Sequence, residues 1–408
     1  MKILVFNAGS SSQKTCLYEI GDSPPDDPPA PLWEGKIDID GNTAAIRLKN
    51  SSGEHADERV TMDGAAQKST AAMLEVLWSE KSKALGAPVV VDAVAHRIVN
   101  GGSDYRDPVR ITGEVKSAIA RMTSFAPLHN ASGLAGIDFA EKRFSGVPQI
   151  AVFDTGFHKT LPESAYVYAG PYEWLEQGIR RFGFHGINHE YCAHRAAKLL
   201  GTDIATLKLV ICHLGNGCSL AAVRYGQSVD TTMGFTPLEG LMMGTRSGSI
   251  DPGIITFLAS QGATGAQLDE LLNRKSGLLG ISGISSDMRE IIEQMKAGDG
   301  RAKLAFDIFV HRLRSSIGSM VATLGGIDAL IFTAGIGENS REIRAAACAD
   351  FAYLGLEIDV AQNARSQPAD HDIARANSRV RILAIRAQED WAMAKAVWEL
   401  ESGRSPTA

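Results

Sequence analysis

Short apolar runs alternate along the chain with segments whose apolar residues recur at helical spacing. The runs at 3–6, 89–99 and 150–154, and one that begins at Ala329, are typical of buried strands. Helical spacing is found at 68–85, 267–272, 287–295, 304–324 and 340–351. Because strand and helix patterns follow one another without a long structureless stretch, the sequence predicts an α/β fold.

A proline-rich segment interrupts this alternation near the N-terminus. The sequence GDSPPDDPPAP, residues 21–31, contains five prolines and three aspartates. These residue types favour turns over strands and helices, so we expect a surface loop here.

Two strand-and-turn segments match each other without a gap. KILVFNAGSSSQK begins at Lys2 and KLVICHLGNGCSL begins at Lys208, and the alignment places Asn7 on His213. Both segments have an apolar strand, a polar residue at its end and a turn of small residues. This shared design indicates an internal duplication.

The turns that follow these strands suit an anion. Small residues leave backbone N–H groups accessible, and ligands of open α/β sheets bind at the carboxyl ends of strands. The first turn, NAGSSSQK at residues 7–14, departs from the Walker A spacing, and taken alone it is better explained as a serine-rich turn. A third stretch, ALIFTAGIGENS, runs from a strand into a glycine-containing loop and then a helix, with Asn339 or Ser340 as N-cap. Three such turns favour a nucleotide site.

The composition restricts the class of protein. A chain of 408 residues is long enough for two domains, and 44% hydrophobic with 22% charged residues is typical of a soluble globular protein. No apolar run reaches membrane-spanning length and no signal-peptide pattern is present, so we expect a cytoplasmic protein without membrane contact. The net charge of -6 argues against a nucleic-acid partner. Five cysteines without a C-x-x-C pair indicate neither a disulfide framework nor a cysteine zinc site.

These features resemble the superfamily of acetate and sugar kinases, actin and the heat-shock chaperone ATPases, and within it the acetate kinase family. The resemblance covers almost the whole chain and rests on NAGSSSQK, AHRIVNGG (95–102), APLHN (126–130), VFDTGFH, RFGFHGINH (181–189), CHLGNG, DTTMGFTPLEGLMMGTRSGSIDPG (230–253), GISSDMRE, FTAGIGENS and QED (388–390). It implies two duplicated actin-like (ribonuclease H-like) α/β domains with an active-site cleft between them. The first would comprise residues 1–153 and 390–408, and the second residues 154–389.

The resemblance also implies an activity. The γ-phosphoryl group of ATP would pass directly and reversibly to acetate, giving acetyl phosphate and ADP, with Mg²⁺ as the cofactor and Mn²⁺ as a substitute. Members of the family are homodimers, so a homodimer is expected. A propionate or other short-chain carboxylate kinase would share every motif. An ATP-gated chaperone or filament protein would share only the nucleotide turns.

Phosphoryl transfer depends on positioning and charge neutralisation more than on covalent chemistry, and arginine suits both tasks. By resemblance, Arg97 in HRIVNGG and Arg246 in GTRSGS contact the substrate carboxylate and the transferring phosphoryl group. His185 in FGFHGI would donate a hydrogen bond to a phosphoryl oxygen. The remaining catalytic candidates are Asn7, His129 and Asp154.

A carboxylate substrate is already ionised at neutral pH and needs no general base. Asp154 is therefore expected to orient Mg²⁺, its bound water or an arginine. Mg²⁺ prefers oxygen ligands and usually keeps several waters. We expect Asp154 and Glu389 to hold the metal, with Asn7 and Ser12 acting through water; the resemblance assigns Glu389 to the metal.

The resemblance places the nucleotide between the turn after strand 208–214 and the glycine-rich stretch at 335–337, with Asp287 and Arg289 at the ribose and base. The nucleotide-binding candidates are Lys14, Ser10, Ser12, His213, Leu214, Gly215, Asn216, Gly217, Asp287, Met288, Arg289, Gly335, Ile336, Gly337 and Asn339.

An apolar pocket is expected around the methyl group of acetate. The resemblance places Val99, Leu128, Phe184 and Pro237 there, with Arg97 at the carboxylate. One methylene changes selectivity by only about 1 to 3 kcal/mol, so some propionate activity is expected.

Several residues depart from the usual family pattern: Ile187 and Asn188 replace Thr-Ser, Ser249 replaces an aspartate, and Ala387 with Gln388 replaces Thr followed by Asn or Asp. They bear on the geometry around the site and on metal affinity. The spacing of His185, His189 and His194 also raises a zinc site as a weaker alternative, although His189 is better explained as a helix-start or packing residue.

Overall fold

The computed structural model describes residues 1–8, 12–40, 43–61, 70–79, 86, 90–124, 127–365 and 370–403. The chain divides into two compact units: unit 1 comprises Met1–Gly156 and Gln388–Ala408, and unit 2 comprises Phe157–Ala387. The domain boundaries expected from the sequence lie within three residues of these. Asp154 and Glu389 were expected in the second domain, and the compact units place both in unit 1.

Within the described residues, unit 1 contains one mixed sheet of eight strands in the order β5-β4-β3-β2-β1-β6-β8-β7. The strands are β1 (Lys2–Ala8), β2 (Ser12–Glu19), β3 (Trp33–Asp40), β4 (Thr43–Asn50), β5 (His55–Thr61), β6 (Ala93–Ile98), β7 (Val109–Arg110) and β8 (Gln149–Phe153). The helices are α1 (Thr70–Leu77), α3 (Gly113–Arg121), η1 (Met122–Ser124), α4 (Pro127–Arg143) and α16 (Glu389–Glu401).

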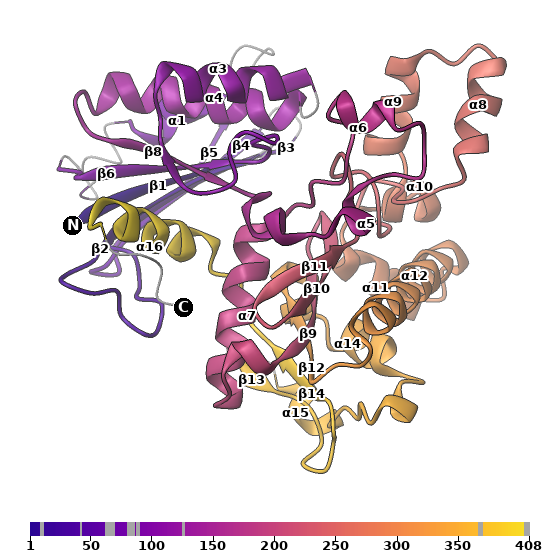
Figure 1. The fold of residues 1–408 in the computed structure, drawn as a ribbon. Coiled ribbons are helices and arrows are strands. Elements are labelled where there is room, and N and C mark those ends of the chain that lie inside the picture. The colour runs from indigo at the N-terminus through magenta and orange to yellow at the C-terminus, as the bar shows by residue number, and fades with distance from the viewer. Residues whose placement is uncertain are drawn as a thin grey trace. The chain divides into compact units, whose positions relative to one another are not determined.

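Both faces of the central strand β1 are covered, which explains its uninterrupted apolar sequence. Leu4 and Phe6 join the core that contains Trp33 and Trp78, whereas Val5, on the opposite face, is also fully buried. Figure 1 shows α1, α3 and α4 on one side of this sheet and α16 on the other. The C-terminal helix therefore completes the unit that the N-terminal strand begins.

Unit 2 contains, among the described residues, a six-stranded sheet in the order β11-β10-β9-β12-β14-β13. The strands are β9 (Lys208–Leu214), β10 (Cys218–Arg224), β11 (Gln227–Thr231), β12 (Ala329–Thr333), β13 (His371–Asp372) and β14 (Arg381–Ala384). The helices are η2 (Gly156–Thr160), α5 (Glu163–Tyr166), α6 (Glu173–Glu176), α7 (Gly186–Leu200), η3 (Ile204–Thr206), α8 (Pro252–Ser260), α9 (Gly265–Arg274), α10 (Gly277–Ser282), α11 (Met288–Lys296), α12 (Gly300–Leu324), α13 (Ala334–Asn339), α14 (Arg341–Cys348), η4 (Ala352–Leu354) and α15 (Val360–Ala364).

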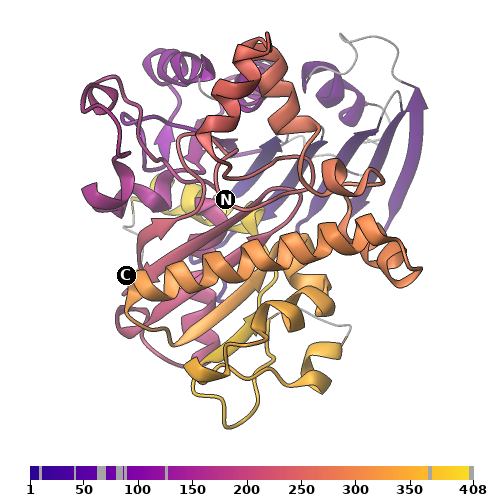
Figure 2. The same cartoon turned by 90° about the vertical axis from the view of Figure 1, so that its right-hand side faces the viewer.

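Helices α7 and α12 cover opposite faces of this second sheet (Figure 1). Figure 2 shows the long helix α12 crossing the strands. Leu209 and Ile211 of β9 pack against Cys192 and Ala196 of α7. The alternate residue Val210 is fully buried as well.

The two sheets share the topology that a duplication predicts. In each, the first strand pairs antiparallel with the next and parallel with a later one: Ile3 lies opposite Ala93, and Leu209 lies opposite Ala329. Ile3 and Leu209 occupy the same position in the sequence alignment, so the repeat holds along the first strand of each half.

The expectation of an alignment without a gap is wrong in the hairpin. Asn7 pairs with Lys14 in unit 1, but His213 pairs with Ser219 in unit 2. The turn of unit 2 is therefore one residue shorter. This shift pairs Ser219 with His213 in the strand register.

Other expected elements are present with changed limits. Of the helix predicted at 68–85, α1 (Thr70–Leu77) is present, and residues 68, 69 and 80–85 lie outside the described residues. Residues 21–31 form an irregular connection between β2 and β3. The expected glycine loop after β12 is instead the short helix α13, and Ser340 is the N-cap of the following helix α14. No helix among the described residues is long and apolar enough to span a membrane.

His96 of β6 gives unit 1 a predicted pH dependence. Its ring is 1% exposed, stacks on Phe6 and lies 2.6 Å from Gln149 Oε1. Burial lowers the pKa of His96 to about 4, although the bond to Gln149 opposes this shift. The unfolded chain binds the proton at higher pH, so stability is complete above about pH 6.5 and falls toward pH 4, by about 3 kcal/mol in total.

Urea unfolding between pH 7 and pH 4, followed by tryptophan fluorescence, tests this expectation, because four of the five tryptophans belong to unit 1. His96→Gln should flatten the decrease in stability. The exposed His55 provides the control, and His55→Gln should retain the full decrease. Equal pH profiles for H96Q and the parent protein would contradict the assignment.

Candidate active site

Three candidate side chains of unit 1 lie where parallel strands end. Asn7 is near the end of β1, Arg97 is near the end of β6, and Asp154 directly follows β8. These strands are neighbours in the sheet and run in the same direction. Their carboxyl ends therefore bring residues 90 and 57 positions apart into contact.

Arg97 and Asp154 form a close ion pair. Arg97 Nη2 lies 2.6 Å from Asp154 Oδ2, and the side chains are 14% and 1% exposed. Burial alone would lower the pKa of Arg97, but the carboxylates of Asp154 and Glu389 outweigh it and raise the pKa above the usual arginine value. Of the three roles expected for Asp154, orienting an arginine is the one this contact supports.

The first residues of α16 add two more carboxylates to this cluster. Asn7 Nδ2 donates to Glu389 Oε2 at 3.3 Å and to Asp390 Oδ1 at 2.9 Å. Burial raises the pKa of Glu389, Arg97 opposes the rise, and Asp154 and Asp390 add to it. Asn7 thus links β1 to a region crowded with negative charge.

Lys14 also belongs to this cluster. Its ammonium group lies 2.8 Å from Asp390 Oδ2 and 3.1 Å from Glu34 Oε2. Burial by itself lowers the pKa of Lys14, but the charges around it, with Asp390 first, raise it above the ordinary lysine value. Lys14 is therefore held by carboxylates at a position where the sequence suggested phosphate contact.

The charge of this cluster suits a divalent cation. Two cations, Arg97 and Lys14, face the four carboxyl groups of Glu34, Asp154, Glu389 and Asp390. Oxygen donors of this kind are those that Mg²⁺ prefers. In the described part of the chain, no three His, Cys, Asp or Glu side chains are arranged to hold a metal ion by themselves. Mg²⁺ bound here would accordingly keep water ligands.

In unit 2, the equivalent strand end carries imidazoles. The rings of His185 and His213 stack at 3.9 Å with 8° between their planes. A Cβ placed on Gly217 would lie 3.5 Å from His185 Nε2, and one on Gly215 would lie 3.8 Å from His213 Nε2. Both Nε2 atoms therefore border the turn between β9 and β10.

Arg246 reaches the same turn. Its Nη1 would lie 3.4 Å from a Cβ on Gly217, and it donates to the carbonyl of Pro237 at 3.2 Å. Burial lowers the pKa of Arg246. Among the described residues, no carboxylate forms an ion pair with it. An unneutralised guanidinium beside a glycine turn is suited to an anionic ligand.

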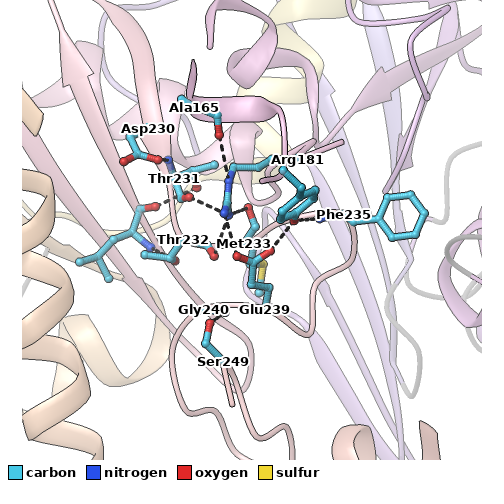
Figure 3. A network of polar contacts seen from close by, with 12 residues as sticks. Ala165, Arg181, Asp230, Thr231, Thr232, Met233, Phe235, Glu239, Gly240 and Ser249 are labelled. Carbon is cyan, nitrogen blue, oxygen red and sulfur yellow. Dashed lines mark hydrogen bonds and ion pairs between the residues drawn. The ribbon is translucent and has the colours of Figure 1, made fainter. Parts of the chain in front are cut away.

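Figure 3 shows the network that fixes the segment carrying Pro237. Arg181 Nη1 donates to the carbonyl groups of Thr231, Thr232 and Met233, and its Nη2 lies 2.7 Å from Glu239 Oε1. In the sequence, Arg181 stands out only as the first residue of the motif RFGFHGINH. Its several donors in one rigid plane explain why arginine is suited to this position.

Two hydrogen bonds between Gly240 and Ser249 join the start and the end of the following loop. The amide of Gly240 donates to Ser249 Oγ at 3.0 Å, and the amide of Ser249 donates to the carbonyl of Gly240 at 2.9 Å (Figure 3). Gly240 has a φ of 106°, a conformation that favours glycine. The serine that departs from the family pattern therefore joins the two ends of the loop.

The nucleotide candidates of unit 2 lie in three places. Asn216 borders Gly244 and Ser286, since a Cβ on Gly244 would approach the side chain of Asn216 and the carbonyl of Ser286. Asp287 is the N-cap of α11, where it pairs with Arg289. The remaining candidates lie in three elements. Met288 begins α11, Leu214 ends β9, and α13 contains Gly335, Ile336, Gly337 and Asn339.

The residues expected around the methyl group are divided between the two units, each of which is described by itself. Val99 belongs to unit 1 and is 5% exposed, whereas Phe184 and Pro237 belong to unit 2. Ser10 lies outside the described residues, as do the side chains of Ser12, Leu128 and His129.

The zinc alternative receives no support. His189 is fully buried and His194 is exposed. Among the described residues, no group of three His, Cys, Asp or Glu side chains is placed to hold a metal ion. The packing role expected for His189 agrees with its burial.

Sequence reasoning missed three residues of these clusters. Asp390 was quoted only as part of QED, Ser219 was not singled out, and Asn188 was noted only as a departure. Asn188 Nδ2 lies 2.8 Å from His213 Nδ1. The sequence shows that Asn188 precedes Cys192 by one helical turn, but it does not show that His213 of β9 is the partner of Asn188.

Two sheets of matching topology, each with a polar cluster after its first strand, define the class of duplicated actin-like α/β ATPase folds. The chain belongs to the acetokinase family, whose model matches residues 2–395. It is 56% identical over 403 residues to the acetate kinase of a Cyanothece species, covering 98% of each chain.

Solved structures agree in fold over the whole length. The acetate kinase of Porphyromonas gingivalis superposes with a TM-score of 0.86 at 37% identity, covering 98% of this chain and 99% of the other. A propionate kinase from Francisella tularensis gives the same TM-score at 36% identity, with 97% and 98% covered.

The Arg181 network generates a prediction about the loop it supports. Arg181→Lys should raise hydrogen–deuterium exchange across 231–241 and reduce local stability by about 2 to 4 kcal/mol, because one ammonium group cannot reach all these acceptors. Arg379→Lys is a matched control, since the exposed Arg379 donates to the single carbonyl of Leu354. Unchanged exchange in the R181K loop would contradict this account.

Proposed function

We propose that this chain catalyses the reversible transfer of the γ-phosphoryl group from ATP to acetate, giving ADP and acetyl phosphate. The observation that carries the proposal is Arg246, a largely buried cation beside a glycine turn with no carboxylate partner among the described residues. Acetate is proposed as the substrate because the related proteins are named acetate kinases. A phosphoryl group bound there would complete the charge balance of Arg246.

The residues divide the work between binding and charge stabilisation. The attacking oxygen belongs to a carboxylate that is ionised at neutral pH, so no side chain has to remove a proton. Arg97, held by Asp154, would orient that carboxylate. Arg246 and His185 would stabilise the charge that spreads over the phosphoryl oxygens during in-line transfer.

Mg²⁺ is proposed as the cofactor and ATP as the co-substrate, with Mn²⁺ able to replace Mg²⁺. Asp154 and Glu389 would hold the ion through oxygen atoms and water, and Asn7 would fix the position of Glu389. A bound Mg²⁺ neutralises phosphate charge and orients the transferring group. His129, Leu128 and the nucleotide-binding set remain assignments from resemblance.

Propionate is the competing substrate. A solved relative is named a propionate kinase, and one methylene changes selectivity by only about 1 to 3 kcal/mol. Val99 favours acetate because its branched side chain narrows the expected pocket. We therefore propose acetate as the preferred acid, with measurable activity toward propionate.

The protein is also proposed to be a homodimer and to act in the cytoplasm. Helix α8 exposes Ile254 and Phe257, which are 45% and 62% accessible. Exposed apolar residues on one helix are consistent with a subunit interface. A nucleic-acid or membrane partner is not part of the proposal.

The acid specificity can be tested by trapping the acyl phosphate with hydroxylamine. With ATP and Mg²⁺, acetate should give the highest kcat/KM, propionate should be about 10-fold to 100-fold lower, and butyrate lower still. Preference for butyrate would refute the acetate assignment. ATP hydrolysis without any hydroxamate would favour the chaperone class.

The two arginines should be separable from nucleotide binding. Arg97→Ala and Arg246→Ala should each lower kcat by about 1000-fold, because each removes charge stabilisation from the reacting groups. Binding of a fluorescent ADP analogue should change by less than about threefold. Arg375→Ala, at an exposed ion pair, is the control. Near-normal turnover in either variant would exclude that arginine from catalysis.

Glu389→Gln should weaken Mg²⁺ binding in a measurable way. The concentration of Mg²⁺ that gives half-maximal activity should rise about 10-fold or more, because the amide keeps the shape of the side chain but removes its charge. Glu401→Gln on the same helix, which affects only the pair with Arg110, should leave it unchanged. An unchanged Mg²⁺ dependence in E389Q would contradict the assignment.

A further inference from the structure

A buried polar layer lies beneath the two stacked imidazoles of unit 2. Ser219, Asn188, His189 and Thr333 are all fully buried, whereas His185 is half-buried. Buried polar groups of this kind form hydrogen bonds with one another. The position of the proton on one group therefore decides whether its neighbour donates or accepts.

Ser219 connects two histidines. Its Oγ lies 2.9 Å from His185 Nδ1 and 2.8 Å from His189 Nε2. A hydroxyl has one proton to donate, so it donates to one ring and accepts from the other. Two arrangements are therefore available, and they leave opposite tautomers on His185.

His189 decides between these arrangements. Its Nδ1 is buried without a hydrogen-bond partner among the described residues, and burial, with His158 and His213 adding to it, lowers its pKa so that the ring stays neutral. An orphaned N–H is rarer in proteins than an under-satisfied acceptor. The proton of His189 therefore lies on Nε2, which donates to Ser219, and Ser219 in turn donates to His185 Nδ1.

Asn188 acts on the second ring. Its Nδ2 lies 2.8 Å from His213 Nδ1, and its Oδ1 lies 3.6 Å from Cys192 Sγ, a weak donor. An amide N–H directed at Nδ1 leaves the proton of neutral His213 on Nε2. The parallel stack at 3.9 Å agrees with neutral rings, because two imidazolium ions at that distance would repel by about 4 kcal/mol at an effective dielectric constant of 20.

We propose that Ser219 and Asn188 are positioning residues which fix the tautomers of His185 and His213, so that both stacked rings present an Nε2–H donor to the turn at 215–217. The inference rests on the proposed function in one respect, since the ligand of the two donors would be the phosphoryl group. The tautomers themselves can be measured without any reaction. Asn188 thereby gains a role that its departure from the family pattern left open.

The test uses the full-length protein with ¹⁵N-labelled histidine and no substrate. Long-range ¹H–¹⁵N correlation spectra distinguish the two neutral tautomers, and the signals are assigned with His185→Gln and His213→Gln. The expected result is an unprotonated Nδ1 and a protonated Nε2 in both rings. A protonated Nδ1 on either neutral ring would overturn the proposal for that ring, whatever the enzyme activity.

Variants separate the two positioning residues. Ser219→Ala should change the tautomer of His185 but not that of His213, and Ser219→Thr, which keeps the hydroxyl, should restore it. Asn188→Asp should reverse the tautomer of His213, because a carboxylate accepts from Nδ1–H. Each variant serves as the control for the other ring. A tautomer of His185 that is the same in S219A as in the parent would exclude Ser219 from the role.

Kinetics gives a second measurement. S219A should lower kcat about 10-fold while the KM values for ATP and acetate stay within about twofold, because the donor would no longer be pre-oriented. Expected tautomers in a protein that forms no acyl phosphate would refute the proposed function and leave the tautomer assignment standing. Equal kcat in S219A and the parent protein would show that the tautomer of His185 does not matter for transfer.

Discussion

The ion pair between Arg97 and Asp154 is the interaction on which the unit 1 cluster depends. Without Arg97, the buried Asp154 would lose its ion-pair partner and Glu389 would lose the cation that opposes the rise of its pKa, whereas Asp390 would keep Lys14. Without Asp154, Arg97 would lose the partner that fixes its guanidinium. Removing one member of a buried pair costs more than the pair contributes, since the other charge remains buried. The geometry of the strand ends is therefore set by charge as well as by packing.

Duplication of one strand-and-turn design has produced two different chemical environments. Asn7 and His213 occupy equivalent positions, but Asn7 contacts carboxylates of α16 and His213 contacts an imidazole and the amide of Asn188. Under the proposed function, unit 1 would offer oxygen ligands to Mg²⁺, and unit 2 would offer N–H donors and the guanidinium of Arg246 to phosphate. One fold used twice would then supply both kinds of contact that a metal–nucleotide complex needs.

The sequence predicted the backbone better than it predicted the contacts. Apolar runs such as the one at Ile3 to Phe6 correspond to strands because burial on both faces requires them. The roles of Asp390 and Ser219 escaped notice because each depends on a partner brought close by the fold. The partners of Ser219 are His185 and His189, and its position in β10 depends on a second turn that is one residue shorter than the first. A gapless comparison of the two repeats could not show that register.

The order of the chain constrains how the unit 1 cluster can form. Asn7 bonds to Glu389 and Asp390 across 382 and 383 residues. Contacts of such separation close a long loop, and the entropy lost in closing it opposes them until other contacts hold the two segments together. Until α16 packs on β1 and β6, Arg97 has Asp154 as a neighbour but lacks the carboxyl group of Glu389. The set of oxygens proposed for Mg²⁺ therefore forms only once α16 has packed on the sheet, and a unit 1 without that packing cannot hold the ion in the same way.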